Sequence, residues 1–111
     1  MDFDNNRPIY LQIVDSICDN ILTGVLNQDE RILSVREYGA EIGVNPNTVA
    51  RSYEKLTDMG VIFQKRGIGF FVAPDAKARI HESAVRTFLE QDLPAFKKKA
   101  EMLGIDVKQY L

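Results

Sequence analysis

The side chains that could do chemistry in this sequence are few and widely spaced. The 111 residues include one cysteine, Cys18, and one histidine, His81, which Glu82 follows. Neither has the spaced His, Cys or carboxylate partners of a metal site or a nucleophilic centre. Cys18 lies in an apolar pattern, which favours a small core residue. We therefore expect no catalytic residue, metal or cofactor, and an enzyme that uses His81 with Glu82, or Cys18, is the weakest of the alternatives.

Basic side chains are concentrated in the middle of the chain, although the formal net charge is −2. Residues 31–74 carry four acidic groups against six basic ones: Arg31, Arg36, Arg51, Lys55, Lys65 and Arg66. Neutralisation of phosphates is the main sequence-independent source of affinity for nucleic acid. The segment therefore predicts a focused basic face of modest affinity, which dimerisation would reinforce.

The basic segment contains the signature of two short helices joined by a tight turn. Ser34 and Glu37 form a capping box that begins the first helix. Gly43 can end it in the left-handed conformation, and Asn45 followed by Pro46 supplies an N-cap and a first-turn proline for the second helix. The apolar spacing Val49, Tyr53, Leu56 continues the second helix to Gly60 and predicts an inward face. This pattern predicts a helix-turn-helix, whose second helix enters the DNA major groove.

Two further elements complete the first 74 residues. Pro8 opens an amphipathic helix that runs to about Thr23, and the connector from Val25 to Leu33 that follows could pair as a short strand. After Gly60, residues 61–65 and 70–72 flank a glycine-containing turn and predict a β-hairpin. A basic hairpin directly after a recognition helix is typical of a wing, with Lys65, Arg66 and Gly67 at its tip.

The remaining residues, 75–111, predict two amphipathic helices, one from Asp75 to about Asp92 and one from Leu93 to Leu103, interrupted at Pro94. They carry more apolar surface than two helices can bury alone. They could pack back on the first domain, but we favour a helical hairpin that pairs with a second copy of the chain. The predicted dimerisation residues are Ile80, Ala84, Phe88, Leu89, Phe96 and Leu103.

Residues 8–72 contain several spaced motifs. They are the segments Pro8-Ile9-Tyr10, Ser34-Val35-Arg36-Glu37, Ile42-Gly43-Val44, Asn47-Thr48-Val49 with Arg51, Tyr53 and Leu56, and Gly67-Ile68-Gly69 with Phe71-Val72. Together these motifs resemble the DNA-binding domain of the GntR family of bacterial transcription regulators. The short tail, with Leu103-Gly104-Ile105, is similar to the YtrA-type subgroup. The resemblance implies a mainly α protein with a small β-hairpin: a winged helix-turn-helix domain (1–74) and a two-helix dimerisation extension (75–111).

The resemblance also implies the residues that face DNA. Arg36 is the best candidate for a guanine contact, with a phosphate clamp as the alternative, and Asn47 and Thr48 begin the recognition helix. Arg51 and Lys55, further along that helix, are expected to lie over the phosphate backbone of the DNA. The complete predicted DNA-binding set is Ser34, Arg36, Asn45, Asn47, Thr48, Arg51, Lys55, Lys65, Arg66 and Gly67, of which Ser34 and Asn45 also act as caps.

Five positions depart from the family pattern. Leu33 replaces the usual proline, Asp29 stands near the usual loop glycine, and Tyr38-Gly39 replaces a Leu-Ala pair. Ala50 stands where some members have a DNA-contacting arginine. One residue is about 100° of helix rotation, so Arg51 cannot simply inherit that contact.

Taken together, these features predict a cytoplasmic, sequence-specific DNA-binding regulator, a repressor in the favoured reading, that binds a palindromic operator as a homodimer. The main alternative is a winged-helix module that binds protein. The short polar and basic groups argue against that alternative, because a protein-binding face would expose aromatic residues. The first ten residues lack a secretory pattern, and no apolar run approaches the roughly 18 residues of a membrane span. Nothing in the sequence identifies an effector.

Overall fold

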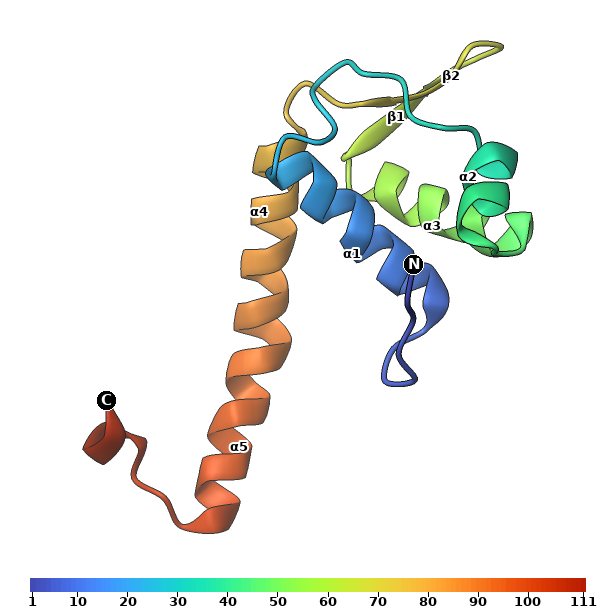
Figure 1. The fold of residues 1–111 in the computed structure, drawn as a ribbon. Helices are drawn as coiled ribbons and strands as arrows, with labels where there is room; N and C mark the ends of the chain where they lie inside the picture. Colours follow the sequence, from blue (N-terminus) through green and yellow to red (C-terminus); the bar gives the residue numbers. More distant parts are fainter. The chain divides into compact units, whose positions relative to one another are not determined.

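The computed structural model describes residues 1–111, which divide into two compact units, Met1–Ile80 and His81–Leu111. The first unit contains three helices followed by a two-stranded antiparallel sheet (Figure 1). This confirms the predicted fold class. The elements are α1 (Ile9–Leu22), α2 (Val35–Ile42), α3 (Pro46–Asp58), β1 (Ile62–Lys65), β2 (Gly69–Val72) and the first turns of α4 (Ala76–Thr87).

The core of the first unit forms where α1 lies against α3 and the sheet closes one end. Ile13, Ile17 and Ile21 recur every four residues of α1, and each is at most 2% exposed. Their spacing places them on one face of the helix. The predicted inward residues of α3 are also buried, and so is Ile80 of α4, at 8% exposed. Ile80 therefore contributes to the core of this unit, and its predicted place in the dimerisation set stays a prediction.

The local signals in the helix-turn-helix act as predicted. The Ser34 hydroxyl accepts a hydrogen bond from the Glu37 amide (3.1 Å), and the Glu37 carboxylate accepts one from the Ser34 amide (3.0 Å). Gly43 ends α2 in the left-handed conformation, at φ 70°. Gly39 is buried, and a Cβ there would lie 2.7 Å from the Val44 carbonyl oxygen. The absence of a side chain at Gly39 thus permits the close turn between α2 and α3.

The sheet consists of the two predicted hairpin strands, and the connector pairs with the second of them at one bridge. β1 and β2 pair from Ile62 opposite Val72 to Lys65 opposite Gly69, and Arg31 forms an isolated bridge with Phe71. Asp29 donates its amide to the Val72 carbonyl (2.8 Å) with a φ of +64°. Asp29 thus adopts the left-handed backbone that suits the glycine usual near this position, and aspartate tolerates that conformation better than most residues.

The second unit is helical through residue 103 and ends in a short 3₁₀ turn. The final residues of α4 continue into a π turn (Phe88–Asp92), α5 (Leu93–Leu103) and a 3₁₀ helix (Val107–Tyr110). The backbone is right-handed helical at both Thr87 and Leu93, so no loop separates α4 from α5. The expectation of a helical hairpin is therefore wrong, although α5 begins where predicted. A wider π turn just before Pro94 accommodates a residue that has no amide hydrogen for the helix ladder.

Candidate nucleic-acid interface

An open hollow lies where the N-terminal ends of α2 and α3 converge. Its volume is about 720 Å³, and it is lined by Val35, Arg36, Asn45, Pro46, Asn47 and Ala50. Arg36 and Asn47 are exposed and contribute a guanidinium and an amide to the same space. Helix N-termini also offer unpaired amides and the positive end of the helix dipole, which attract phosphate. The structure therefore brings together two predicted residues that are 11 positions apart in the sequence.

Two members of the predicted DNA-binding set already have capping roles. The Ser34 oxygen is part of the capping box, and the Asn45 side chain accepts the Asn47 amide at 2.8 Å. Their hydroxyl and amide hydrogens remain as donors. Their structural role is thus to fix the starts of α2 and α3.

The remaining members on α3 differ in environment. Thr48 is half-buried and Lys55 is exposed, while the Arg51 guanidinium lies over the Tyr10 ring, 3.8 Å from Cζ to the ring centroid. The neighbouring Ser52 is fully buried and donates its hydroxyl to the Tyr10 carbonyl at 2.7 Å. Arg51 is thus oriented by α1, a placement that its sequence position alone did not suggest.

The tip of the hairpin carries the predicted basic wing. Lys65 and Arg66 are exposed, and Gly67 makes the turn with a φ of +76°. The Lys65 ammonium lies 4.6 Å from the centroid of the Phe71 ring, which stacks on Phe63 with 5.9 Å between centroids. This aromatic pair supports the stem of the Lys65 side chain while its charge stays at the surface.

Arg31 is a basic residue beside the wing that the predicted DNA-binding set does not include. Its side chain fills the space left by Gly69, where a Cβ would meet Arg31 Nε at 2.9 Å. Hydrogen bonds with Ser34 are the main cause of the lowered pKa of Glu37, and the Arg31 charge lowers it slightly further. Arg31 therefore lies against the wing at Gly69. The bridge to Phe71 that holds it there is non-local, so the only sequence signal was its basic charge.

The inward residues of α3 pack in the core beneath the predicted DNA-binding residues. Val49, Tyr53 and Leu56 are at most 1% exposed, which confirms the prediction that they belong to the core. Tyr53 donates its hydroxyl to the Leu33 carbonyl at 2.6 Å, and its ring makes an edge contact with Phe70 at 5.0 Å. Burial raises the pKa of Tyr53, so it stays a neutral donor. This hydrogen bond fixes the loop directly before α2.

The residues with potential for catalysis are not assembled into a site. Cys18 is 7% exposed, and burial, with the nearby Asp15 and Asp19 charges, raises its pKa to about 12. No group of three or more His, Cys, Asp or Glu side chains is placed to hold a metal ion. None of the helices has the length and apolar character to cross a membrane.

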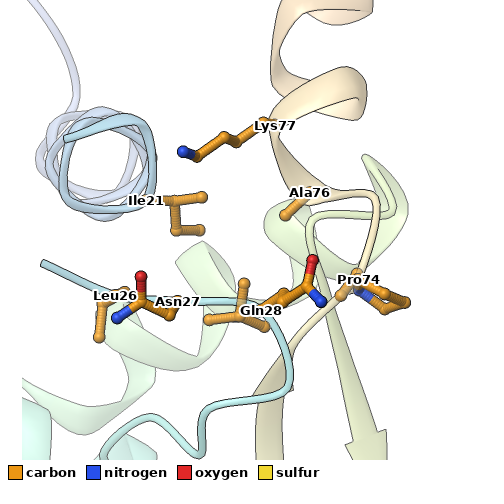
Figure 2. A pocket seen from close by; sticks show the side chains of 9 residues that line it. Ile21, Leu26, Asn27, Gln28, Pro74, Ala76 and Lys77 are labelled. Carbon is orange, nitrogen blue, oxygen red and sulfur yellow. The ribbon is translucent and has the colours of Figure 1, made fainter. Parts of the chain in front are cut away.

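A small hollow beside the start of α4 is shown in Figure 2. Its volume is about 210 Å³, and the Lys77 side chain extends over it toward Ile21, with Asn27 and Gln28 on the loop below. Typical small-molecule sites are larger, at roughly 300–1,000 Å³. The three polar residues are exposed, so the hollow is part of the protein surface.

Comparisons with known proteins agree with this geometry. Residues 9–72 match the model of the gntR family of bacterial regulatory proteins. The transcriptional repressor YtrA of Bacillus subtilis is 29% identical over 98% of this chain and 83% of its own, so the similarity includes the C-terminal extension and supports a YtrA-like subgroup. A GntR-family regulator from Bacteroides thetaiotaomicron superposes with a TM-score of 0.77 at 49% identity, covering 92% of this chain and 88% of its own.

A structure that contains DNA is also similar to this chain. The AraR DNA-binding domain in complex with operator ORX1 has a TM-score of 0.60 and 26% identity, covering 65% of this chain and 93% of its own. This likeness favours DNA binding over the protein-interaction alternative. The chain belongs to the gntR family of bacterial regulatory proteins, which are DNA-binding transcriptional regulators.

Proposed function

We propose that this protein is a repressor that binds a palindromic operator as a homodimer in the bacterial cytoplasm. The observation that carries the proposal is the hollow at the N-termini of α2 and α3, where Arg36 and Asn47 are exposed beside two helix ends. The basic wing lies on the same unit. Short polar groups and an arginine at a helix N-terminus suit the edges of bases and the phosphates that flank them.

Within this proposal Arg36 reads a base, and the other basic residues bind the backbone. A guanidinium can donate two parallel hydrogen bonds to a guanine, which gives sequence preference. Arg51 is stacked on Tyr10 and Lys65 on Phe71, so their charges are held over the surface, as phosphate contacts require. Arg31 joins this group because it lies beside the wing.

The test begins with selection of bound fragments from the source genome, followed by affinity measurements on the selected operator and on random DNA. Arg36→Ala should cost about 1–3 kcal/mol on the operator and relax preference at one position per half-site. Arg86→Ala is the matched control, because Arg86 is an exposed arginine of α4 that pairs with Glu82. Equal losses on operator and random DNA would show that Arg36 is a phosphate contact. If the wild-type protein fails to select any particular sequence, the proposal is overturned.

The dimer is proposed from the second unit, which has almost no core of its own. Among the exposed large apolar side chains of its helices, five are 43–63% exposed, namely Phe88, Leu89, Leu93, Phe96 and Leu103. The spacing of these residues, with one extra residue in the π turn, is compatible with a continuous stripe. Solvent-exposed stripes of this kind are characteristic of helices that pair with another chain. Ala84 is also exposed and would allow close approach.

Sedimentation of the full chain tests this interface. Wild type should be a dimer at tens of micromolar, whereas Phe88→Glu with Phe96→Glu should be monomeric, because two buried charges oppose pairing. Val25→Glu is the matched control, since Val25 is 65% exposed but lies in a loop of the first unit. A monomeric wild type would overturn the dimer, and operator selection would still test DNA binding separately.

A further inference from the structure

A second cavity of the first unit is larger than the hollow of Figure 2 and lies between helices α1, α2 and α3. Its volume is about 450 Å³, within the usual range for sites that bind small molecules. Residues of all three helices, the N-terminus and the connector line it: Met1, Ile17, Asn20, Leu26, Ile32, Leu33, Tyr38, Glu41, Ile42 and Tyr53. The cavity thus combines an aliphatic wall with two aromatic residues.

The side of this cavity formed by Tyr38 and Glu41 of α2 suits a ligand that carries positive charge. Glu41 is the only acidic side chain that lines the cavity, no lysine, arginine or histidine does, and the one cationic group among the lining residues is the N-terminal ammonium of Met1. Glu41 is exposed, so its carboxylate needs no internal partner. The Tyr53 hydroxyl uses its hydrogen on the Leu33 carbonyl, which leaves its oxygen as an acceptor.

Tyr38 adds an aromatic surface that is half-buried rather than covered. Its ring is tilted by 54° against Tyr53, with 6.2 Å between the centroids. Burial raises the pKa of Tyr38, so the ring stays neutral. Aromatic rings attract ammonium groups through their negative faces, and a neighbouring carboxylate adds to the attraction. Tyr38 is also one of the residues by which this chain departs from the family pattern.

We propose that this cavity binds a small organic cation, whose apolar body lies against Tyr38 and the aliphatic wall and whose ammonium group faces Glu41. The ligand would touch α2 and the connector at Leu33, directly before Ser34 and Arg36. Its binding would therefore bear on the segments that position the DNA-facing residues. The proposal itself does not depend on DNA binding.

Three probes with the same body and different charge test the proposal: 3-phenylpropylammonium, 3-phenyl-1-propanol and 3-phenylpropanoate. Titrations followed by amide chemical shifts should give affinities that fall in this order, with the largest shifts at residues of the cavity. Glu41→Gln should weaken binding of the ammonium probe by about two- to fivefold while leaving the alcohol unchanged. Tyr38→Ala should weaken the ammonium and the alcohol, because both lose the aromatic surface.

Glu101→Gln is the matched control, because Glu101 is an exposed glutamate of α5 that does not line the cavity. It should leave all three affinities unchanged, and circular dichroism would confirm that each variant is folded. The proposal is overturned if the ammonium probe shows no binding at a concentration of about 10 mM, which is well above the roughly millimolar dissociation constant of a weak ligand. Equal binding of the three probes, or shifts that map outside the cavity, would overturn it as well.

Discussion

The guanidinium of Arg51 lies over the ring of Tyr10 instead of extending freely from α3: its Cζ is 3.8 Å from the centroid of that ring. Tyr10 is in the first turn of α1, 41 residues earlier in the chain. The Tyr10 carbonyl also accepts the hydroxyl of Ser52, the residue next to Arg51. Tyr10 thus fixes both the start of α1 against α3 and the direction of one arginine.

We predict that Tyr10 and Arg51 are energetically coupled. A double-mutant cycle of Tyr10→Leu and Arg51→Ala, measured as the free energy of unfolding, should give a coupling of about 0.5–1 kcal/mol. Tyr10→Leu should also lower affinity for operator and random DNA alike, because Arg51 loses its orientation toward the phosphates. Lys55→Ala in place of Arg51→Ala is the control and should be additive with Tyr10→Leu. If the effects of the two substitutions are additive, the stacking of Arg51 on Tyr10 does not contribute to the free energy of unfolding.

The wing should contribute charge rather than sequence preference. In Lys65→Gln with Arg66→Gln, the slope of log affinity against log salt should fall by about 1–2, since each phosphate contact releases close to one counterion. Preference between operator and random DNA should change little. Lys98→Gln with Lys99→Gln removes the same charge from α5 and should preserve the slope. An unchanged slope in the wing variant would place Lys65 and Arg66 off the DNA.

Two glycines of the hairpin should have different consequences when a methyl group is added. Both have positive φ, +76° at Gly67 and +145° at Gly69, so Ala at either position should destabilise the fold by about 1–2 kcal/mol. Only Gly69→Ala also displaces Arg31, because nothing lies within 4 Å of a Cβ at Gly67. DNA affinity should therefore fall further in Gly69→Ala and match that of Arg31→Ala. Equal affinities in the two glycine variants would exclude a role for Arg31.

The capping box should make stability depend on acid pH. The Ser34 amide, and then the Ser34 side chain, stabilise the Glu37 carboxylate and lower its pKa from 4.5. Because the pKa of Glu37 is lower in the folded state, the ionised carboxylate stabilises the fold. This stabilisation is complete above pH 4.5 and is lost as the pH falls through the folded-state pKa. Denaturant unfolding at pH 7 and pH 3 should show that the free energy of unfolding decreases less on acidification in Glu37→Gln than in wild type. Glu54→Gln, on the exposed face of α3, should keep the wild-type pH dependence.

Cys18 should be unreactive in the native state. Its pKa of about 12 leaves almost no thiolate at pH 8, and its side chain is 7% exposed. Modification by a disulfide reagent should be slow and should accelerate with subdenaturing urea, because it requires opening of the core. Lys98→Cys in a Cys18→Ala background supplies an exposed thiol that should react at once. Rapid stoichiometric labelling of native wild type would contradict this placement of Cys18.

The predictions that the structure confirms are those encoded by neighbouring residues. Ser34 with Glu37, Gly43, and Asn45 with Pro46 each satisfy or end a helix within one turn, so their effect does not depend on the rest of the chain. The buried face of α3 followed from helical spacing in the same way. The hairpin followed from two β-rich runs around Gly67 and Gly69.

Contacts between distant segments could not be read from these patterns. The stacking of Arg51 on Tyr10 depends on how α1 crosses α3, and the place of Arg31 depends on its bridge to Phe71. Ile80 fits the apolar row of its helix equally well as an interface or a core residue, and only packing distinguishes the two. The helical backbone before Pro94 likewise reflects a π turn that periodicity does not encode.

The sequence by itself determined that a capped helix-turn-helix with a basic wing forms between Ser34 and Val72, because caps, glycines and apolar spacing act over a few residues. Tertiary structure alone decided that Arg36 and Asn47 line one hollow, and that Tyr38, Glu41 and Tyr53 line a second cavity. Helix spacing fixes which face is apolar. It leaves open the distance and angle between helices, and these set the shape of every cavity.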